Sequence, residues 1–136
     1  MAQVRIYGLM LVLDTNALLA ILTRPNLLGS KTTKLVTNQG LLYFSSISVF
    51  EIAIKNMLGK LSLSRPLTEL LDSPALRSVP FALEEAVETY SLPSLSRHEP
   101  FDRMILATAR SHGAKLITSD RKILELGFDW VLDSSK

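Results

Sequence analysis

Strand-like apolar segments alternate with helix-like segments along the whole chain, and this alternation limits the fold more than any other feature. Such an order predicts a mainly parallel sheet covered by helices on both faces. Two of the strand-like segments run into an aspartate: residues 11–13 lead into Asp14, and residues 115–118 lead through Ser119 into Asp120. We therefore expect an α/β protein with three α/β/α layers and a central sheet of four to five strands.

The expected elements follow from periodicity and from glycine and proline stops. The expected strands are the apolar stretch ending at Asp14 and residues 41–44, 77–79, 115–118 and 129–132. The expected helices are residues 17–23, 30–38, 67–71, 83–90, 100–112 and 121–126, with another from Ser48 to the stop at Gly59. A core face of that last helix is predicted from Val49, Ile52, Ala53 and Met57. In the helix 83–90, outward positions are predicted for Glu84, Glu85 and Glu88.

The composition is that of an ordinary globular domain and excludes several kinds of site. Of 136 residues, 47% are hydrophobic and 21% are charged, and no run approaches the roughly 20 apolar residues of a membrane helix. The lack of cysteine excludes disulfides, thiolate zinc sites and cysteine nucleophiles. Residues 1–5 lack the apolar core of a secretion signal, so we expect a cytoplasmic protein.

The formal net charge of +2 does not by itself indicate a nucleic-acid binder. If several acids were gathered into a metal site, however, the remaining surface would be more basic. Its lysines and arginines would then be available to phosphates, although most of them individually are expected to be ordinary solvated charges.

Four acidic residues fall where strands should end or helices begin: Asp14, Glu51, Asp102 and Asp120. In an open α/β sheet, ligands bind in the crevice outside the carboxyl ends of the strands, so acids at those ends converge although they are distant in sequence. Converging carboxylates repel one another, and a cation relieves that repulsion. The pattern predicts a site for a divalent metal ion.

Each acid also has an ordinary structural explanation. Asp14 and Asp120 are suited to capping the helices that follow them, and the helix dipole favours an acid at Asp102 in a first helical turn. Ser48 and Glu51 match a capping box, and Glu51 is also placed to pair with the lysine four residues later. Capping alone does not explain why acids follow buried strands, so the metal site is the better interpretation.

In its motifs the chain resembles the PIN domain family, and within it the VapC-type ribonuclease toxins of type II toxin-antitoxin pairs. The matching motifs are LVLDTN at residues 11–16, SVFEIAIK at 48–55, PFDRMILATA at 100–109 and LITSD at 116–120. Met10 resembles the usual first residue. Residues 1–9 are thus expected to be an N-terminal extension or the start of the first strand, and residues 10–136 a single PIN domain. Many relatives carry a histidine and Arg-Asp-Pro where this chain has Arg97, His98, Glu99 and Pro100.

The resemblance implies a Mg²⁺-dependent endoribonuclease, with Mn²⁺ as a substitute ion. It implies four catalytic acids, namely Asp14, Glu51, Asp102 and Asp120. Among these, Asp14 and Asp102 are expected to bind the metal directly, because Mg²⁺ takes only one or two carboxylates and keeps several waters. Asn16 and Thr118 are expected as supporting polar residues. The implied partners are RNA, a cognate VapB-type antitoxin and a second copy of the chain, with DNA bound only through the antitoxin.

Several further residues have two readings. Arg103 is placed to contact an RNA phosphate or to pair with Glu99 one turn earlier. The aromatic rings of Tyr43, Phe50 and Phe101 are candidates for stacking on bases, although core packing is the more common role of such rings. Neither histidine is expected to be catalytic, because a metal removes the need for a histidine base.

Two other functions remain open from the sequence. A receiver-like regulatory domain would have the same doubly wound fold with an acidic pocket, but it needs a lysine after a late strand, and Lys115 precedes its strand. A non-catalytic PIN-like module that binds a metal, ligand or partner is the third reading, and the complete set of four acids argues against it.

Overall fold

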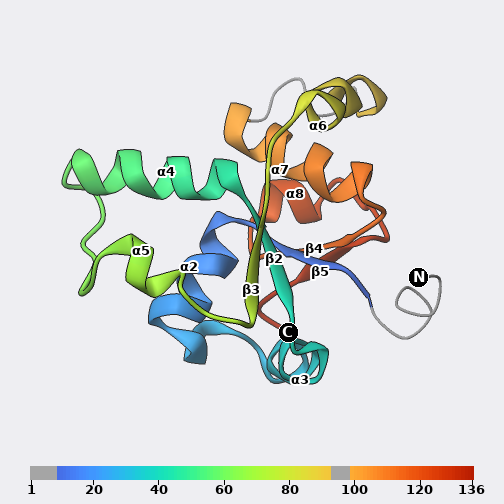
Figure 1. Cartoon of the computed structure of the whole chain (residues 1–136). Helices are drawn as coiled ribbons and strands as arrows, with labels where there is room; N and C mark the ends of the chain where they lie inside the picture. Colours follow the sequence, from blue (N-terminus) through green and yellow to red (C-terminus); the bar gives the residue numbers. More distant parts are fainter. Residues whose placement is uncertain (1–8, 93–98) are drawn as a thin grey trace.

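The computed structural model describes residues 9–92 and 99–136, and the chain forms a five-stranded parallel sheet between helical layers (Figure 1). The strands, in their order across the sheet, are β3 (Leu76–Val79), β2 (Leu42–Ser45), β1 (Leu11–Leu13), β4 (Lys115–Thr118) and β5 (Val131–Asp133). All four pairings between neighbours are parallel. The α/β fold and the strand number are confirmed. The expectations for residues 1–8, Arg97 and His98 lie outside the described residues.

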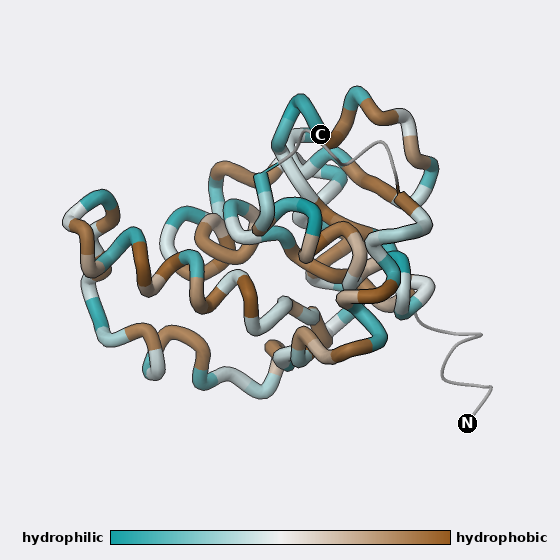
Figure 2. Tube along the Cα trace, turned by 90° about the horizontal axis from the view of Figure 1, so that it is seen from above, coloured by the Kyte–Doolittle hydropathy of each residue, from teal (hydrophilic) through white to brown (hydrophobic). Residues whose placement is uncertain are grey.

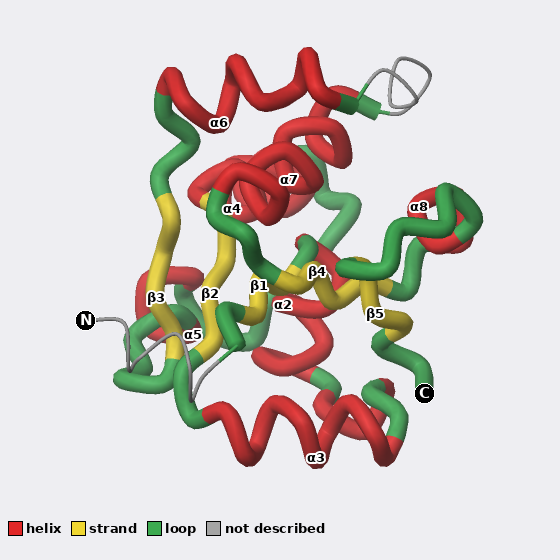
Figure 3. Tube along the Cα trace, turned by 90° about the vertical axis from the view of Figure 1, so that its right-hand side faces the viewer, coloured by secondary structure: helices red, strands yellow, loops and turns green. Residues whose placement is uncertain are grey.

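The helices pack on both faces of this sheet (Figure 3). In the described ranges they are α2 (Thr15–Thr23), α3 (Ser30–Gln39), α4 (Ser46–Met57), α5 (Leu67–Leu70), α6 (Leu83–Glu88), α7 (Pro100–Ser111) and α8 (Arg121–Leu124), with the 3₁₀ turns η1 (Pro25–Leu27) and η2 (Thr89–Ser91). Within that part of the chain, no helix is both long and apolar enough to span a membrane.

The central strand β1 is buried on both faces. Val12 belongs to the hydrophobic core shared with α7 and α8, whereas Leu11 and Leu13 face the core shared with α2, α3 and α4. All three side chains are fully buried, and each stabilises the fold by roughly 1.5–3 kcal/mol. Figure 2 shows hydrophobic segments of the chain running through the middle of the molecule. The strand that carries Asp14 is therefore firmly anchored.

The strand order reverses next to β1. From β1 the chain proceeds outward to β2 and β3, and it then returns to add β4 and β5 on the other side. Ligand crevices of open parallel sheets lie at the carboxyl ends of the strands where the order reverses. Here that position is between β1 and β4, and the acids that follow these two strands are Asp14 and Asp120.

The capping box predicted for α4 is wrong. The helix begins at Ser46, and its N-cap is Ser45, whose hydroxyl accepts a hydrogen bond of 3.0 Å from the Ile47 amide. Ser45, Ser46 and Ser48 are all suitable N-caps. Because β2 continues directly into the helix, the first of them, Ser45, is the N-cap. Ser48 is instead buried inside the helix, and Glu51 is released from any capping role. The predicted core position of Met57 is also wrong, because the far end of α4 extends beyond the sheet and leaves this side chain 77% exposed (Figure 1).

The outward position predicted for Glu85 is wrong as well. This side chain is only 4% exposed, and its carboxylate accepts a bond of 2.9 Å from the Ala82 amide and lies 2.8 Å from His112 Nε2. Burial alone would raise the pKa of Glu85, but hydrogen bonds from its own amide, from Ala82 and from His112 outweigh burial and lower it. The contact between Glu85 and His112 joins α6 to the end of α7.

Other differences concern element ends. The helix at residues 83–90 divides into α6 and η2, α8 stops at Leu124, and the last strand lies slightly later than expected, at Val131–Asp133. Gly40, Gly59 and Gly113 follow their helices with positive φ angles, and these predicted stops are confirmed.

Gly29 provides a test of how the C-terminal residues pack on α3. A Cβ atom at this position would lie 2.0 Å from the Lys136 carbonyl oxygen, while the Gly29 amide donates to Ser134 and the Thr32 amide donates to Lys136. Gly29→Ala should displace residues 134–136 and lose about two hydrogen bonds, each worth roughly 1 kcal/mol. We expect thermal denaturation to show a Tm lower by several degrees. Lys31→Ala, on the exposed side of α3, is the control, and equal Tm values for the two variants would contradict the packing.

Candidate active site

Asp14 ends the central strand and begins α2, and it is held from two sides. Its Oδ1 atom accepts a bond of 2.8 Å from the Ala17 amide, so the residue does cap α2 as one sequence interpretation proposed. Its Oδ2 atom accepts a bond from the Thr118 hydroxyl at the end of β4. The side chain is only 6% exposed. Capping and membership of a polar site are therefore not alternatives at this residue.

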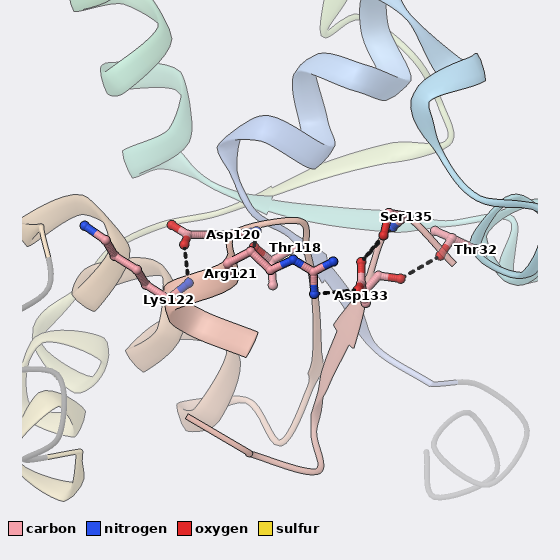
Figure 4. A network of polar contacts seen from close by, with 7 residues as sticks. All are labelled: Thr32, Thr118, Asp120, Arg121, Lys122, Asp133 and Ser135. Carbon is pink, nitrogen blue, oxygen red and sulfur yellow. Dashed lines mark hydrogen bonds and ion pairs between the residues drawn. The ribbon is translucent and has the colours of Figure 1, made fainter. Parts of the chain in front are cut away.

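Thr118 links Asp14 to Asp120. While donating to Asp14, its hydroxyl accepts a bond of 3.0 Å from the Asp120 amide. Asp120 in turn accepts a bond of 2.8 Å from the Lys122 amide at the start of α8 (Figure 4). The hydroxyl at Thr118 thus links two acids that follow neighbouring strands, and its supporting role in a functional site stays a prediction.

Asp102 lies in the first turn of α7 and is partly buried. The pKa of Asp14 rises from its ordinary value of 3.8 to about 6, chiefly through burial. The negative charges of Asp102 and Asp120 add to this rise, and the hydrogen bonds from Thr118 and Ala17 oppose it. Two of the other predicted acids, Asp102 and Asp120, therefore act electrostatically on Asp14.

Glu51 lies on the α4 side of the same region and has different neighbours. Its Oε1 atom is 2.6 Å from the Thr15 hydroxyl, and its Oε2 atom pairs with Lys55 Nζ at 2.9 Å. The predicted pairing with the lysine one turn later is confirmed. Glu51 is not among the charges that raise the pKa of Asp14. Its connection to Asp14 is the hydrogen bond with Thr15, the residue next to Asp14.

The donor set suits a hard cation that retains much of its water. Within the described ranges, no three carboxylate or imidazole side chains stand close enough to form a ready-made metal cage. Mg²⁺ needs no such cage, because it binds through one or two carboxylates and keeps several waters. The buried Asp14, whose pKa is raised by burial and by the charges of Asp102 and Asp120, is a position that a positive charge would stabilise.

The structure also contains a carboxylate that the sequence analysis missed. Asp133 ends β5 in register with Thr118, and its carboxylate accepts bonds from the amide and hydroxyl of Ser135 and pairs with Arg121 at 3.7 Å (Figure 4). These contacts lower the pKa of Asp133, and the hydrogen bond from the Ser135 hydroxyl has the largest effect. The backbone carbonyl of Asp133 also accepts a bond from the Thr32 hydroxyl, which links β5 to α3.

The other residues predicted to support the site or to contact RNA differ in how exposed they are. Asn16 is exposed at the start of α2, and Arg103 is partly buried beside Asp102 with its amide bonded to the Glu99 carbonyl; the roles proposed for these two side chains stay predictions. Tyr43 packs against the core. Phe50 is exposed and makes an edge-to-face contact with Phe101, with ring centroids 5.9 Å apart.

Comparison with known proteins settles the family. The profile of the PIN domain matches residues 11–129. The chain belongs to the PIN domain family. Within the family it groups with VapC-type proteins: it is 31% identical over 101 residues to Ribonuclease VapC22 of Mycobacterium tuberculosis, covering 73% of this chain and 78% of that protein.

Solved structures share the PIN fold. The structure of DNA-bound VapBC from Salmonella typhimurium matches with a TM-score of 0.65 and 20% identity over 92% of this chain and 98% of the other. A toxin-antitoxin complex from Klebsiella pneumoniae matches with a TM-score of 0.62 and 21% identity over 90% and 96% of the two chains. The PIN-like fold expected from the sequence is confirmed.

The raised pKa of Asp14 predicts how the stability of the metal-free PIN domain depends on pH. Between pH 3.8 and about 6 the folded protein holds a proton on Asp14 that the unfolded chain releases. The contribution of Asp14 to the free energy of unfolding therefore falls as pH rises through that window. Asp14→Asn removes a burial cost of on the order of 3 kcal/mol at most, so it should raise the Tm by several degrees at pH 7.5 in EDTA.

The control for this measurement is Asp72→Asn, at an exposed aspartate. This variant should leave the pH profile of the metal-free domain unchanged. An Asp14→Asn profile that coincides with the wild type from pH 4 to 8 would contradict the electrostatic description of the site.

Proposed function

We propose that this PIN domain is the toxin component of a type II toxin-antitoxin pair and that it is a Mg²⁺- or Mn²⁺-dependent endoribonuclease. The observation that carries the proposal is the buried Asp14, whose pKa is raised by burial and by two acids that converge on it from other elements. The relative named Ribonuclease VapC22 supports RNA as the substrate. The catalytic residues proposed are Asp14, Glu51, Asp102 and Asp120.

Asp14 and Asp102 are the proposed direct ligands, and Asp120 and Glu51 would bind water around the ion or hold a second ion. When bound, a divalent ion neutralises the carboxylates, polarises the scissile phosphate and lowers the pKa of water. With water as the nucleophile, hydrolysis leaves a 5′-phosphate and a 3′-hydroxyl. Arg103 is proposed to contact an RNA phosphate, and Asn16 to support the pocket.

The chain contributes preorganisation to this chemistry. Both oxygens of Asp14 accept hydrogen bonds, one from the Ala17 amide and the other from the Thr118 hydroxyl, so the carboxylate need not reorient during reaction. The Lys122 amide restrains Asp120 in the same way. A histidine base is unnecessary in this scheme. His112, at the end of α7, contacts Glu85 of α6.

The proposed protein partners are a VapB-type antitoxin and a second copy of the chain, with DNA reached only through the antitoxin. Similar structures are described as complexes of toxin with antitoxin, and that from Salmonella typhimurium is bound to DNA. Exposed apolar side chains supply surface for these partners: Phe50, Met57 and Leu58 at α4, and Leu83, Val87 and Tyr90 at α6 and η2. Because a toxin that cuts RNA meets its substrate in the cytoplasm, we also assign the protein there.

Neutralising Asp14 tests the catalytic proposal. Asp14→Asn preserves the shape of the side chain but removes the charge that would bind the metal, so RNA cleavage and growth arrest on expression should both be abolished. Cleavage of a labelled RNA in Mg²⁺ and in Mn²⁺ measures the first effect. Asp72→Asn should retain wild-type cleavage. A folded Asp14→Asn protein that still cuts RNA would exclude the proposed site.

Metal binding separates the enzyme from a non-catalytic module. We expect calorimetric titration with Mn²⁺ to give binding heat in the wild type that Asp102→Asn reduces strongly, whereas the exposed Asp129→Asn should leave it unchanged. Heat that does not depend on Asp102 would favour a module without this metal site. A receiver-like domain is disfavoured by the structure, because Lys115 is the first residue of β4 and lies at the opposite end of the strand from the acids.

A further inference from the structure

Two buried hydroxyls join the start of α2 to Glu51 on α4. Thr15 Oγ1 lies 3.0 Å from Ser48 Oγ and 2.6 Å from Glu51 Oε1. Thr15 is 4% exposed and Ser48 is fully buried, so water cannot easily replace either contact. Ser48 and Glu51 are three residues apart on α4 and therefore share one face of that helix.

The direction of these bonds follows from counting protons. A hydroxyl group has one proton to donate, and an ionised carboxylate can only accept. Thr15 therefore donates its proton to Glu51, and Ser48 donates its own proton to Thr15. The result is a chain of hydrogen bonds from Ser48 through Thr15 to Glu51. The bond from Thr15 to Glu51 is short and charge-assisted, and such bonds are stronger than those between neutral groups.

This chain fixes one of the two oxygens of Glu51 from inside the protein. The other oxygen meets Lys55, whose side chain is 42% exposed whereas that of Glu51 is 14% exposed; a lysine that reaches such an i to i+4 pair from solvent holds its geometry only weakly. The buried bond from Thr15 is thus the contact that restrains Glu51. Since Thr15 follows Asp14 directly, the same backbone turn places both the buried acid and the group that orients the acid on α4.

We propose that Thr15 is a positioning residue of the active site, which orients Glu51 through the Ser48–Thr15–Glu51 chain and couples its placement to that of Asp14. The proposal rests on the ribonuclease function proposed above and assigns to Thr15 a role that acts through Glu51. Thr118 has the matching role on the other side, since its hydroxyl donates to Asp14. Each of two threonines therefore orients one acid.

The variant that tests this role is Thr15→Val, which keeps the shape and removes the hydroxyl. Loss of a residue that orients a metal-site acid typically lowers metal affinity or activity by about 10- to 100-fold, and we expect that loss in both Mn²⁺ affinity and RNA cleavage. Thr15→Ser should restore most of each. Thr23→Val is the matched control, because Thr23 lies in the same helix and bonds only to the Leu19 carbonyl in the structure.

A double-mutant cycle with Glu51→Gln distinguishes positioning from a general structural effect. If Thr15 acts through Glu51, adding Thr15→Val to Glu51→Gln should cause no further loss of cleavage or Mn²⁺ affinity. An equal loss in both backgrounds, or wild-type values for Thr15→Val, would overturn the proposal. Thermal denaturation of each variant confirms that the compared proteins are folded.

A spectroscopic measurement tests the hydrogen-bond chain without any activity. The Thr15 hydroxyl proton should exchange slowly with water and give a resolved NMR signal with nuclear Overhauser contacts to Ser48. That signal should vanish in Thr15→Val and shift in Glu51→Gln; a wild-type protein without it would overturn the chain. If instead the signal is present but the wild type neither binds Mn²⁺ nor cuts RNA, the proposed function fails while the hydrogen-bond chain stands.

Discussion

The central constraint on the structure is an acidic side chain placed at the end of its most buried strand. The three apolar residues of β1 cannot be moved without opening both hydrophobic cores, so Asp14 is carried into a position where burial opposes ionisation. Two hydrogen bonds oppose the rise in its pKa, and the charges of Asp102 and Asp120 add to it. A bound cation, as proposed above, would offset both the burial and the neighbouring charges.

The dipeptide Asp14–Thr15 divides the site into two halves. The Asp14 side chain meets Thr118 of β4, whereas the Thr15 side chain meets Ser48 and Glu51 of α4. Consecutive side chains at the turn from strand to helix thus reach different elements, so a single backbone segment sets the relative placement of acids on both sides. Precision of this kind is easier to maintain at the end of a rigid strand than on a loop.

Much of the fold and part of the site could be predicted from the sequence, because both depend on local patterns. Apolar runs that end in acids identified β1 and β4, and the requirement that parallel strands align their carboxyl ends placed Asp14 and Asp120 together. The start of α4 and the position of Glu85 were predicted wrongly. Neighbouring serines offer equal caps, and a glutamate among polar residues gives no sign that a histidine 27 residues later will contact it. The role of Thr15 was missed for the same reason, since its partners lie on another helix.

Stability and function are in tension at this site. The metal-free fold must bury an acid that would be more stable protonated at pH values up to about 6, and a polar but uncharged residue in its place would remove that cost. Active sites commonly retain such unfavourable groups because the same property supports their chemistry. A carboxylate that water solvates poorly gains more from a divalent ion than an exposed one does, since both charges then interact at a lower effective dielectric. The burial that raises the pKa of Asp14 is therefore what would make it an effective metal ligand.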